Sequence, residues 1–368
     1  MRGQSQQCML DSFFGSLSDT GEWLRGVSDR GFAKARNHLS WGCLERLNTY
    51  VVQCADQLGL IGRWHGLRVV AADASVLMPA VRPCFTLRRA ADADQRLFCL
   101  YLPGAELSLH ASVHAGDVSE RQMLFEALAC LGPDDLLVLD RGYPAAWLVA
   151  HLNERKIRFC MRCDKANGWL AMRAFMRSGQ QEAVVTLNKP SAQDALEYLC
   201  SGDAPQVRLI RQVTPDGQIR VLATNLPAAD FPAALFGDLY HQRWRIEEAF
   251  KRLKHRLKME CVSGLTQHAL LVDVFAKVLA DNLASLVCNT TSQEAHLQPR
   301  SRNCNRAYAA VCLQRLLPRM VLGLGCIASL LDCAMKLLAA NTHRRVPDRS
   351  QPRPAYHVKP HPHLAYKG

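Results

Sequence analysis

Three short strand-like segments, with helical segments between them, constrain the fold of this chain most strongly. Residues 67–72 and 136–139 are largely continuous apolar runs, residues 157–163 alternate like a strand, and helical patterns occupy residues 119–131 and 145–156. An apolar run without alternation is typical of a strand buried on both faces, as in a sheet covered by helices. We therefore predict an α/β fold in which a mixed sheet is flanked by helices.

The composition of the chain is that of a basic globular protein. Hydrophobic residues make up 49% of its 368 residues, and this length permits one large core with an insertion or two ordinary domains. Lysine and arginine total 45 against 33 aspartate and glutamate residues, which gives a net charge of +12. This excess favours polyanionic partners such as nucleic acid or an anionic membrane surface.

The cysteines and the most apolar stretch give no sign of a secreted or membrane protein. The 15 cysteines are scattered, and the N-terminus lacks the apolar core of a secretory signal, so we expect a cytoplasmic protein. Cys160 and Cys163 form a CxxC pair without a second pair at zinc-ribbon spacing, and we expect them to be buried strand residues. Residues 320–340 contain Asp332 and Lys336, which favours a packed helix over a membrane span.

The pattern of apolar residues changes along the chain and predicts six segments. Short alternating runs separated by turn residues predict a mostly β insertion within the core. The segments are a helical N-terminal region (1–62), the first part of the core (63–163), the β-rich insertion (164–222), the second part of the core (223–290), a helical C-terminal region (291–341) and a basic disordered tail (342–368).

An aspartate directly follows each of two predicted buried strands. Asp73 follows the run at 67–72, and Asp140 follows the run at 136–139. The end of a central strand holds a carboxylate in a fixed position, as a ligand of a divalent cation needs. An aspartate there can also cap a turn or the next helix. Asp92 and Asp94 lie in a polar segment and are weaker candidates for the first of these acids.

A predicted helix from residue 240 to residue 258 carries a mixed polar row. At about 100° per residue, Tyr240, Arg243, Glu247, Lys251 and Lys254 share one face. A neighbouring apolar stripe lets the helix dock on a sheet; it consists of Leu239, Ile246, Phe250, Leu253 and Leu257. One carboxylate among cations and a tyrosine suits phosphate binding. The alternative is an ordinary amphipathic helix in which Glu247 pairs with Arg243 and Lys251, with Glu248 solvated.

The steps of three, four and seven residues from Tyr240 to Arg243, Glu247 and Lys254 resemble the Tyr-Arg-Glu-Lys signature of the insertion-sequence-four family of DDE transposases. Further similarity extends from about residue 28 to residue 290; it comprises Phe32-Ala33-Lys34-Ala35-Arg36, Asp73-Ala74-Ser75, Asp140-Arg141-Gly142-Tyr143, Ala223-Thr224-Asn225-Leu226 and Ser263-Gly264-Leu265. The resemblance implies an RNase H-like core. The chain begins close to the helices that precede this core, so it resembles an N-terminally shortened member.

The resemblance implies catalytic, metal-binding roles for Asp73, Asp140 and Glu247, with two Mg²⁺ or Mn²⁺ ions per active site. Hard divalent cations prefer carboxylate oxygens, and two such ions can activate the attacking oxygen and stabilise the leaving one. Tyr240, Arg243 and Lys254 would then contact DNA phosphates. Trp169 is a candidate for stacking on an extruded base, although aromatic residues more often fill cores.

The expected function is a DNA transposase that cleaves at transposon ends and transfers strands into target DNA. Its partners would be double-stranded DNA with terminal inverted repeats, target DNA and a second copy of the chain, in the bacterial cytoplasm and at the nucleoid. One alternative is a catalytically inactive or domesticated DNA-binding derivative. Another is an RNase H-like nuclease that cleaves without transferring strands, and the Tyr-Arg-Lys companions of Glu247 argue against it.

Overall fold

The computed structural model describes residues 5–18, 23–78, 94–164, 166, 168–214, 217–264, 266–297 and 302–344. Its internal contacts divide the chain into two compact units. The sheet unit comprises Asp56–Val76 and Gln95–Phe250, and the helical unit comprises Met1–Ala55, Leu77–Asp94 and Lys251–Gly368. The predicted tail, residues 342–368, lies outside the described residues from position 345 onward. Asp92 also lies outside the described residues.

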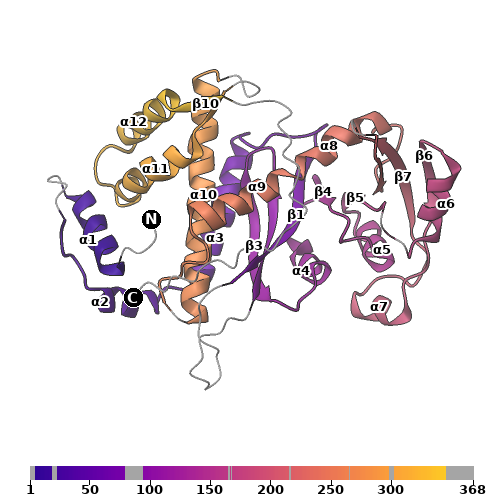
Figure 1. The fold of residues 1–368 in the computed structure, drawn as a ribbon, viewed down its shortest axis with the longest axis horizontal. Helices are drawn as coiled ribbons and strands as arrows, with labels where there is room; N and C mark the ends of the chain where they lie inside the picture. The colour runs from indigo at the N-terminus through magenta and orange to yellow at the C-terminus, as the bar shows by residue number, and fades with distance from the viewer. Residues whose placement is uncertain are drawn as a thin grey trace. The chain divides into compact units, whose positions relative to one another are not determined.

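The sheet unit contains one eight-stranded sheet in the order β3-β2-β1-β4-β5-β8-β7-β6 (Figure 1). Its strands are β1 (Arg68–Leu77), β2 (Gln95–Leu102), β3 (Leu107–Ala115), β4 (Asp135–Leu139), β5 (Arg158–Arg162), β6 (Glu182–Thr186), β7 (Gln206–Val213) and β8 (Ile219–Thr224). The central pairs β1·β4 and β4·β5 are parallel, whereas β2·β3, β5·β8, β7·β8 and β6·β7 are antiparallel. The predicted mixed sheet is therefore present.

Helices cover this sheet because its central strands are apolar on both faces. On one face, Leu136 and Val138 of β4 belong to a core cluster with Phe236 and Leu239 of α8. The intervening Leu137 and Leu139 are equally buried and point to the opposite face. The helices of the sheet unit are α4 (Glu120–Ala127), α5 (Ala146–Glu154), α6 (Leu170–Ser178), α7 (Ala192–Glu197), α8 (Phe236–Gln242) and α9 (Arg245–Lys251), with short 3₁₀ turns at Leu128–Cys130 and Ala233–Leu235.

The segment at 164–222 does not form a sheet of its own. Strands β6 and β7 lie within it and β8 begins there, and all three extend the central sheet beyond β5. Helices α6 and α7 occupy much of the remaining chain. The antiparallel pairing of β8 with β5 is what joins this segment to the parallel core.

The predicted helix at 240–258 is interrupted twice. Helix α8 ends at Gln242, a turn at Arg243 and Trp244 follows, and α9 begins at Arg245. After α9 the chain forms a π-helical turn, Arg252–Arg256. A π-helical turn bonds each residue to the fifth one along rather than the fourth. The phase of an ideal α-helix therefore does not carry over to Lys254, which corrects the single polar face predicted from the sequence.

The helical unit is arranged around one long helix, α10 (Gln267–Glu294). Its other elements are α1 (Gln6–Leu17), α2 (Asp29–Arg36), α3 (Trp41–Gln57), the π-helical turn Arg252–Arg256, α11 (Arg306–Val321), α12 (Ile327–Ala340) and the antiparallel pair β9 (Arg302–Cys304) and β10 (Thr342–Arg344). Trp41 stacks on Phe275 with ring centroids 5.2 Å apart, and the Asn282 amide donates to Asn48 Oδ1 at 2.7 Å. These contacts hold α3 against α10.

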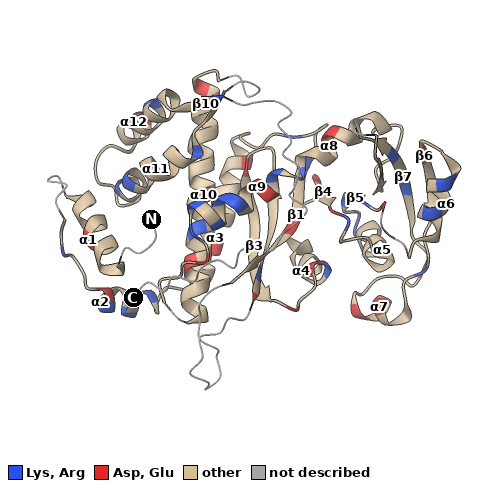
Figure 2. Ribbon diagram, viewed as in Figure 1, with Lys and Arg blue, Asp and Glu red and all other residues tan. Residues whose placement is uncertain are grey.

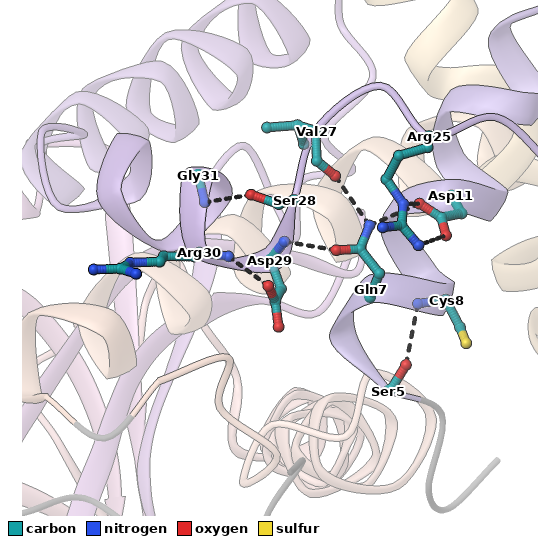
Figure 3. A network of polar contacts seen from close by, with 10 residues as sticks. All are labelled: Ser5, Gln7, Cys8, Asp11, Arg25, Val27, Ser28, Asp29, Arg30 and Gly31. Carbon is teal, nitrogen blue, oxygen red and sulfur yellow. Dashed lines mark hydrogen bonds and ion pairs between the residues drawn. The ribbon is translucent and has the colours of Figure 1, made fainter.

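Polar contacts tie α1 to α2 (Figure 3). The Gln7 amide donates to Asp11 Oδ1 at 2.7 Å and to the Val27 carbonyl at 3.0 Å, while Gln7 Oε1 accepts from the Asp29 N–H. Arg25 donates two hydrogen bonds to the Asp11 carboxylate, at 2.8 and 2.9 Å. Side chains of α1 therefore bind Arg25, Val27 and Asp29, which lie just before and at the start of α2.

A buried ion pair joins the first residues of β1 and β4, and its loss should destabilise the sheet unit. Arg68 donates to both carboxylate oxygens of Asp135, at 2.6 and 2.9 Å, and only 1% of the Asp135 side chain is exposed. We expect Asp135→Asn to lower the free energy of unfolding by about 3 kcal/mol, because it leaves a half-buried guanidinium without its main partner. Urea denaturation measures this change. Arg63→Ala, which removes a more exposed pair with Asp56, should cost less than about 1 kcal/mol; equal losses would contradict this account.

Candidate functional site

The pairing register of β1 and β4 places two of the predicted acids opposite each other. The parallel strands align Arg68 with Asp135 and Ala71 with Val138. The same alignment continued by two residues sets Asp73 opposite Asp140. Strand β1 runs on to Leu77, so Asp73 lies within the strand rather than at its end, whereas Asp140 directly follows β4. In-register positions on neighbouring parallel strands point to the same face of a sheet, so both carboxylates lie on one side.

The turn after β4 fixes the Asp140 carboxylate. Asp140 Oδ1 accepts a hydrogen bond from the Gly142 N–H at 2.7 Å, and the Tyr143 N–H donates to the Asp140 carbonyl at 3.4 Å. From the first turn of α4, Arg121 Nε donates to the Gly142 carbonyl at 3.1 Å. The turn is therefore held both by its own backbone and by α4.

Arg243 links the first acid to the third. Its Nη1 lies 3.6 Å from Asp73 Oδ2 and its Nη2 donates to Glu247 Oε1 at 3.0 Å. Arg243 is only 6% exposed. Burial acts to lower its pKa, but the neighbouring Tyr240, Asp73 and Glu247 outweigh burial and raise it. The structure thus brings Glu247 to Asp73 through one buried guanidinium.

Burial sets the electrostatics of Asp73. It raises the pKa of this carboxyl to about 7, against the lowering effect of Arg243 and the Ala74 N–H; the charges of Glu120 and Asp140 raise it further. A carboxylate that is buried near like charges is costly to ionise. Positive charge placed beside Asp73 would relieve that cost.

Glu120 is an acid of this site that the sequence did not single out. It is the first residue of α4, and Arg96 Nη1 lies 3.5 Å from its Oε1. Burial raises the pKa of Glu120, and the charge of Asp140 raises it further. An acidic residue after a serine N-cap is common at any helix start. No sequence signal therefore distinguished Glu120 from an ordinary first-turn acid.

The remaining predicted residues lie in different surroundings. Tyr240 is 4% exposed and packs in the core, and the Arg243 guanidinium carbon lies 5.9 Å from its ring centroid. Lys254 lies in the π-helical turn of the helical unit. Trp169 is 5% exposed at the start of α6, which favours the core role. The phosphate-binding and base-stacking roles stay predictions.

The CxxC pair has the properties of buried strand residues. Cys160 and Cys163 are both fully buried at β5 and its end, and burial raises the pKa of each thiol well above its usual range. A thiol that stays protonated is a poor metal ligand. The predicted strand role of these residues agrees with their surroundings.

The donor set of the acid group fits a hard divalent cation. Figure 2 shows acidic residues on β1, at α4 and on α9. Asp73, Asp140 and Glu120 influence one another electrostatically, and magnesium or manganese prefers such oxygen ligands. Within the described part of the chain, no three histidine, cysteine or acidic side chains are placed so that they could hold a metal ion together. Arg243 supplies positive charge between Asp73 and Glu247.

A model of the transposase DDE domain matches residues 65–283. The chain belongs to this transposase family. The match includes both aspartates, Glu247 and the residues around them. No curated protein matches the chain.

Membership in the transposase DDE family and the eight-stranded mixed sheet flanked by helices confirm the RNase H-like α/β fold class that the sequence predicted. The family implies a nucleic-acid-processing enzyme that acts on DNA and depends on divalent metal ions. None of the helices described in this transposase is both long and apolar enough to cross a bilayer.

The raised pKa of Asp73 predicts a specific pH dependence of stability in the metal-free transposase. The folded state holds the Asp73 proton up to about pH 7, whereas the unfolded chain releases it near 3.8. The stability contributed by the protonated form is therefore lost as the pH rises through about 7. With chelator present, Asp73→Asn should melt higher than wild type at pH 8 and close to it at pH 4.

Thermal melts between pH 4 and pH 8 measure this difference. Asp117→Asn, at an exposed position of the same unit, serves as the control and should follow wild type throughout. An Asp73→Asn difference that does not change with pH would contradict the assignment.

Proposed function

We propose that this chain is an active DDE transposase that cleaves DNA at transposon ends and joins the freed ends to target DNA. The observation that carries the proposal is the pairing of Asp73 and Asp140 on adjacent parallel strands, with Glu247 linked to Asp73 through Arg243. This arrangement gathers acids that are far apart in the chain on one face of the sheet.

The proposed site residues have distinct tasks. Asp73, Asp140 and Glu247 hold two Mg²⁺ or Mn²⁺ ions, which supply activation of the attacking oxygen and charge stabilisation at the leaving oxygen. Arg243, whose two terminal nitrogens lie beside Asp73 and Glu247, would contact a phosphate through the remaining N–H groups of its planar guanidinium. Tyr240 keeps the Arg243 guanidinium against its ring and, with Lys254, completes the phosphate contacts.

The substrate follows from the same proposal. The net charge of +12 favours double-stranded DNA, with the terminal inverted repeats as donor and a second duplex as target. We place the chain in the insertion-sequence-four family on its Tyr240, Arg243, Glu247 and Lys254 spacing. It would act as a homodimer, because two transposon ends must be paired, and in the bacterial cytoplasm at the nucleoid.

A cleavage assay with matched variants of α9 tests this function. With labelled DNA that carries the candidate terminal repeats and with Mg²⁺, wild type should yield nicked and joined products. Glu247→Gln should lower the cleavage rate by about two orders of magnitude or more, since a cation ligand contributes several kcal/mol to transition-state stabilisation. Glu248→Gln changes the adjacent, exposed acid and should keep wild-type activity.

The outcomes of this assay separate the candidate functions. Cleavage without Mg²⁺, or full activity of Glu247→Gln, overturns the metal-carboxylate assignment. Nicks without joined products identify a nuclease. Binding of the repeats without cleavage by wild type identifies an inactive DNA-binding derivative.

The proposed role of Lys254 predicts a change in the salt dependence of DNA binding. A lysine that contacts one phosphate releases about one counterion, so Lys254→Ala should reduce the slope of log K against log salt by about 1. The loss should be similar for specific and unrelated DNA sequences. Lys189→Ala, at an exposed loop position, is the matched control. A slope equal to that of wild type in Lys254→Ala would remove Lys254 from the interface.

A further inference from the structure

Glu120 and Asp140 converge on one point above Gly142. A β-carbon added to Gly142 would stand 3.0 Å from Asp140 Oδ1 and 3.8 Å from Glu120 Oε2. The two carboxylates therefore lie within 4 Å of the same point, although they come from different elements. The charge of Glu120 also acts on Asp73. Glu120 is thus part of the same acidic group as the two strand aspartates.

Helix α4 holds Glu120 in a fixed position toward the turn after β4. The Ser119 side chain caps α4 by accepting from the Gln122 N–H. The next residue, Arg121, donates to the Gly142 carbonyl at 3.1 Å. Glu120 lies between the capping residue Ser119 and Arg121, whose side chain is hydrogen-bonded to the turn after Asp140. Its backbone is therefore held in place before a cation binds, as a cation ligand requires.

The hydroxyl of Tyr143 is a second, independent sign that the acidic group receives a ligand. Tyr143 is fully buried, and the structure gives its hydroxyl no hydrogen-bond partner among the described residues. The charged groups that act on this phenol are Glu120, Asp73, Asp140 and Arg243. Buried hydroxyls in native proteins are nearly always satisfied. A buried donor that has no partner among the described residues, and on which the charges of three carboxylates act, fits an oxygen ligand that enters with a cation.

Among the described residues, Glu120 has an ion-pair contact with Arg96, and that contact does not account for its position. Arg96 lies 3.5 Å from Glu120 Oε1, but Arg96 Nε already donates to the Gly116 carbonyl at 3.0 Å. The contact with Arg96 uses one carboxylate oxygen. The other oxygen, Oε2, is the one that faces Gly142.

We propose that Glu120 is a fourth carboxylate of the cation-binding group, beside Asp73 and Asp140, and that the Tyr143 hydroxyl donates a hydrogen bond to an oxygen ligand held there. The inference rests on the proposed metal-dependent function and adds two residues to its site. Glu120 contributes negative charge and an oxygen donor, and Tyr143 orients the ligand.

Manganese binding to the full chain without DNA tests the inference separately from catalysis. Titration followed by electron paramagnetic resonance gives the Kd for Mn²⁺. Glu120→Gln and Tyr143→Phe should each raise this Kd by about tenfold, the effect expected for groups that orient or supplement the main ligands. Glu120→Asp keeps the charge but shortens the side chain and should also bind Mn²⁺ more weakly than wild type.

Glu126→Gln changes an acid of the same helix whose partners are Gln122 and His114, and it should keep wild-type Mn²⁺ affinity. Wild-type affinity in Glu120→Gln or in Glu120→Asp overturns the role of Glu120, and wild-type affinity in Tyr143→Phe overturns that of Tyr143. These results would leave the proposed function intact. A wild-type chain that does not bind Mn²⁺ overturns the metal-dependent function itself.

Discussion

The parallel pairing of β1 with β4 is the interaction on which the candidate site depends. Because Arg68 is aligned with Asp135, Asp73 and Asp140 lie opposite each other on one face of the sheet. The buried ion pair between these two residues holds that register at the start of both strands. A shift of one residue would turn one of the two aspartates to the other face of the sheet. The apolar core on either side of β4 makes such a shift costly.

Arg243 governs the electrostatics of the site. The Arg243 guanidinium, although only 6% exposed, stays charged, and the carboxylates of Asp73 and Glu247 lie beside it. The interruption between α8 and α9 falls at this residue, so the break in the helix and the placement of the charge coincide. The acidic group, with Asp73, Asp140, Glu120 and Glu247, has more carboxylates than the guanidiniums of Arg243 and Arg96 beside it, which is the physical basis for its proposed affinity for divalent cations.

Much of the sheet unit could be predicted from the sequence, because its central strands are short, rich in apolar residues and separated by helices. The strands that became β1, β4 and β5 were recognisable from such runs, and Asp73 and Asp140 stood out at their ends. The sequence did not predict that β6, β7 and β8 would extend the main sheet, since the choice of an antiparallel neighbour leaves no periodic signal in the sequence. Glu120 was missed because an acid in the first turn of a helix is ordinary.

The sequence by itself determined the α/β class, the two strand aspartates and the spacing of Tyr240, Arg243, Glu247 and Lys254, because these depend on local periodicity and residue type. Only the tertiary structure decided which side chains meet. It set Asp73 opposite Asp140, placed Arg243 between Asp73 and Glu247, and brought the carboxylates of Glu120 and Asp140 to the same point at Gly142. Such meetings depend on strand register and helix breaks, which arise from packing between segments far apart in the chain.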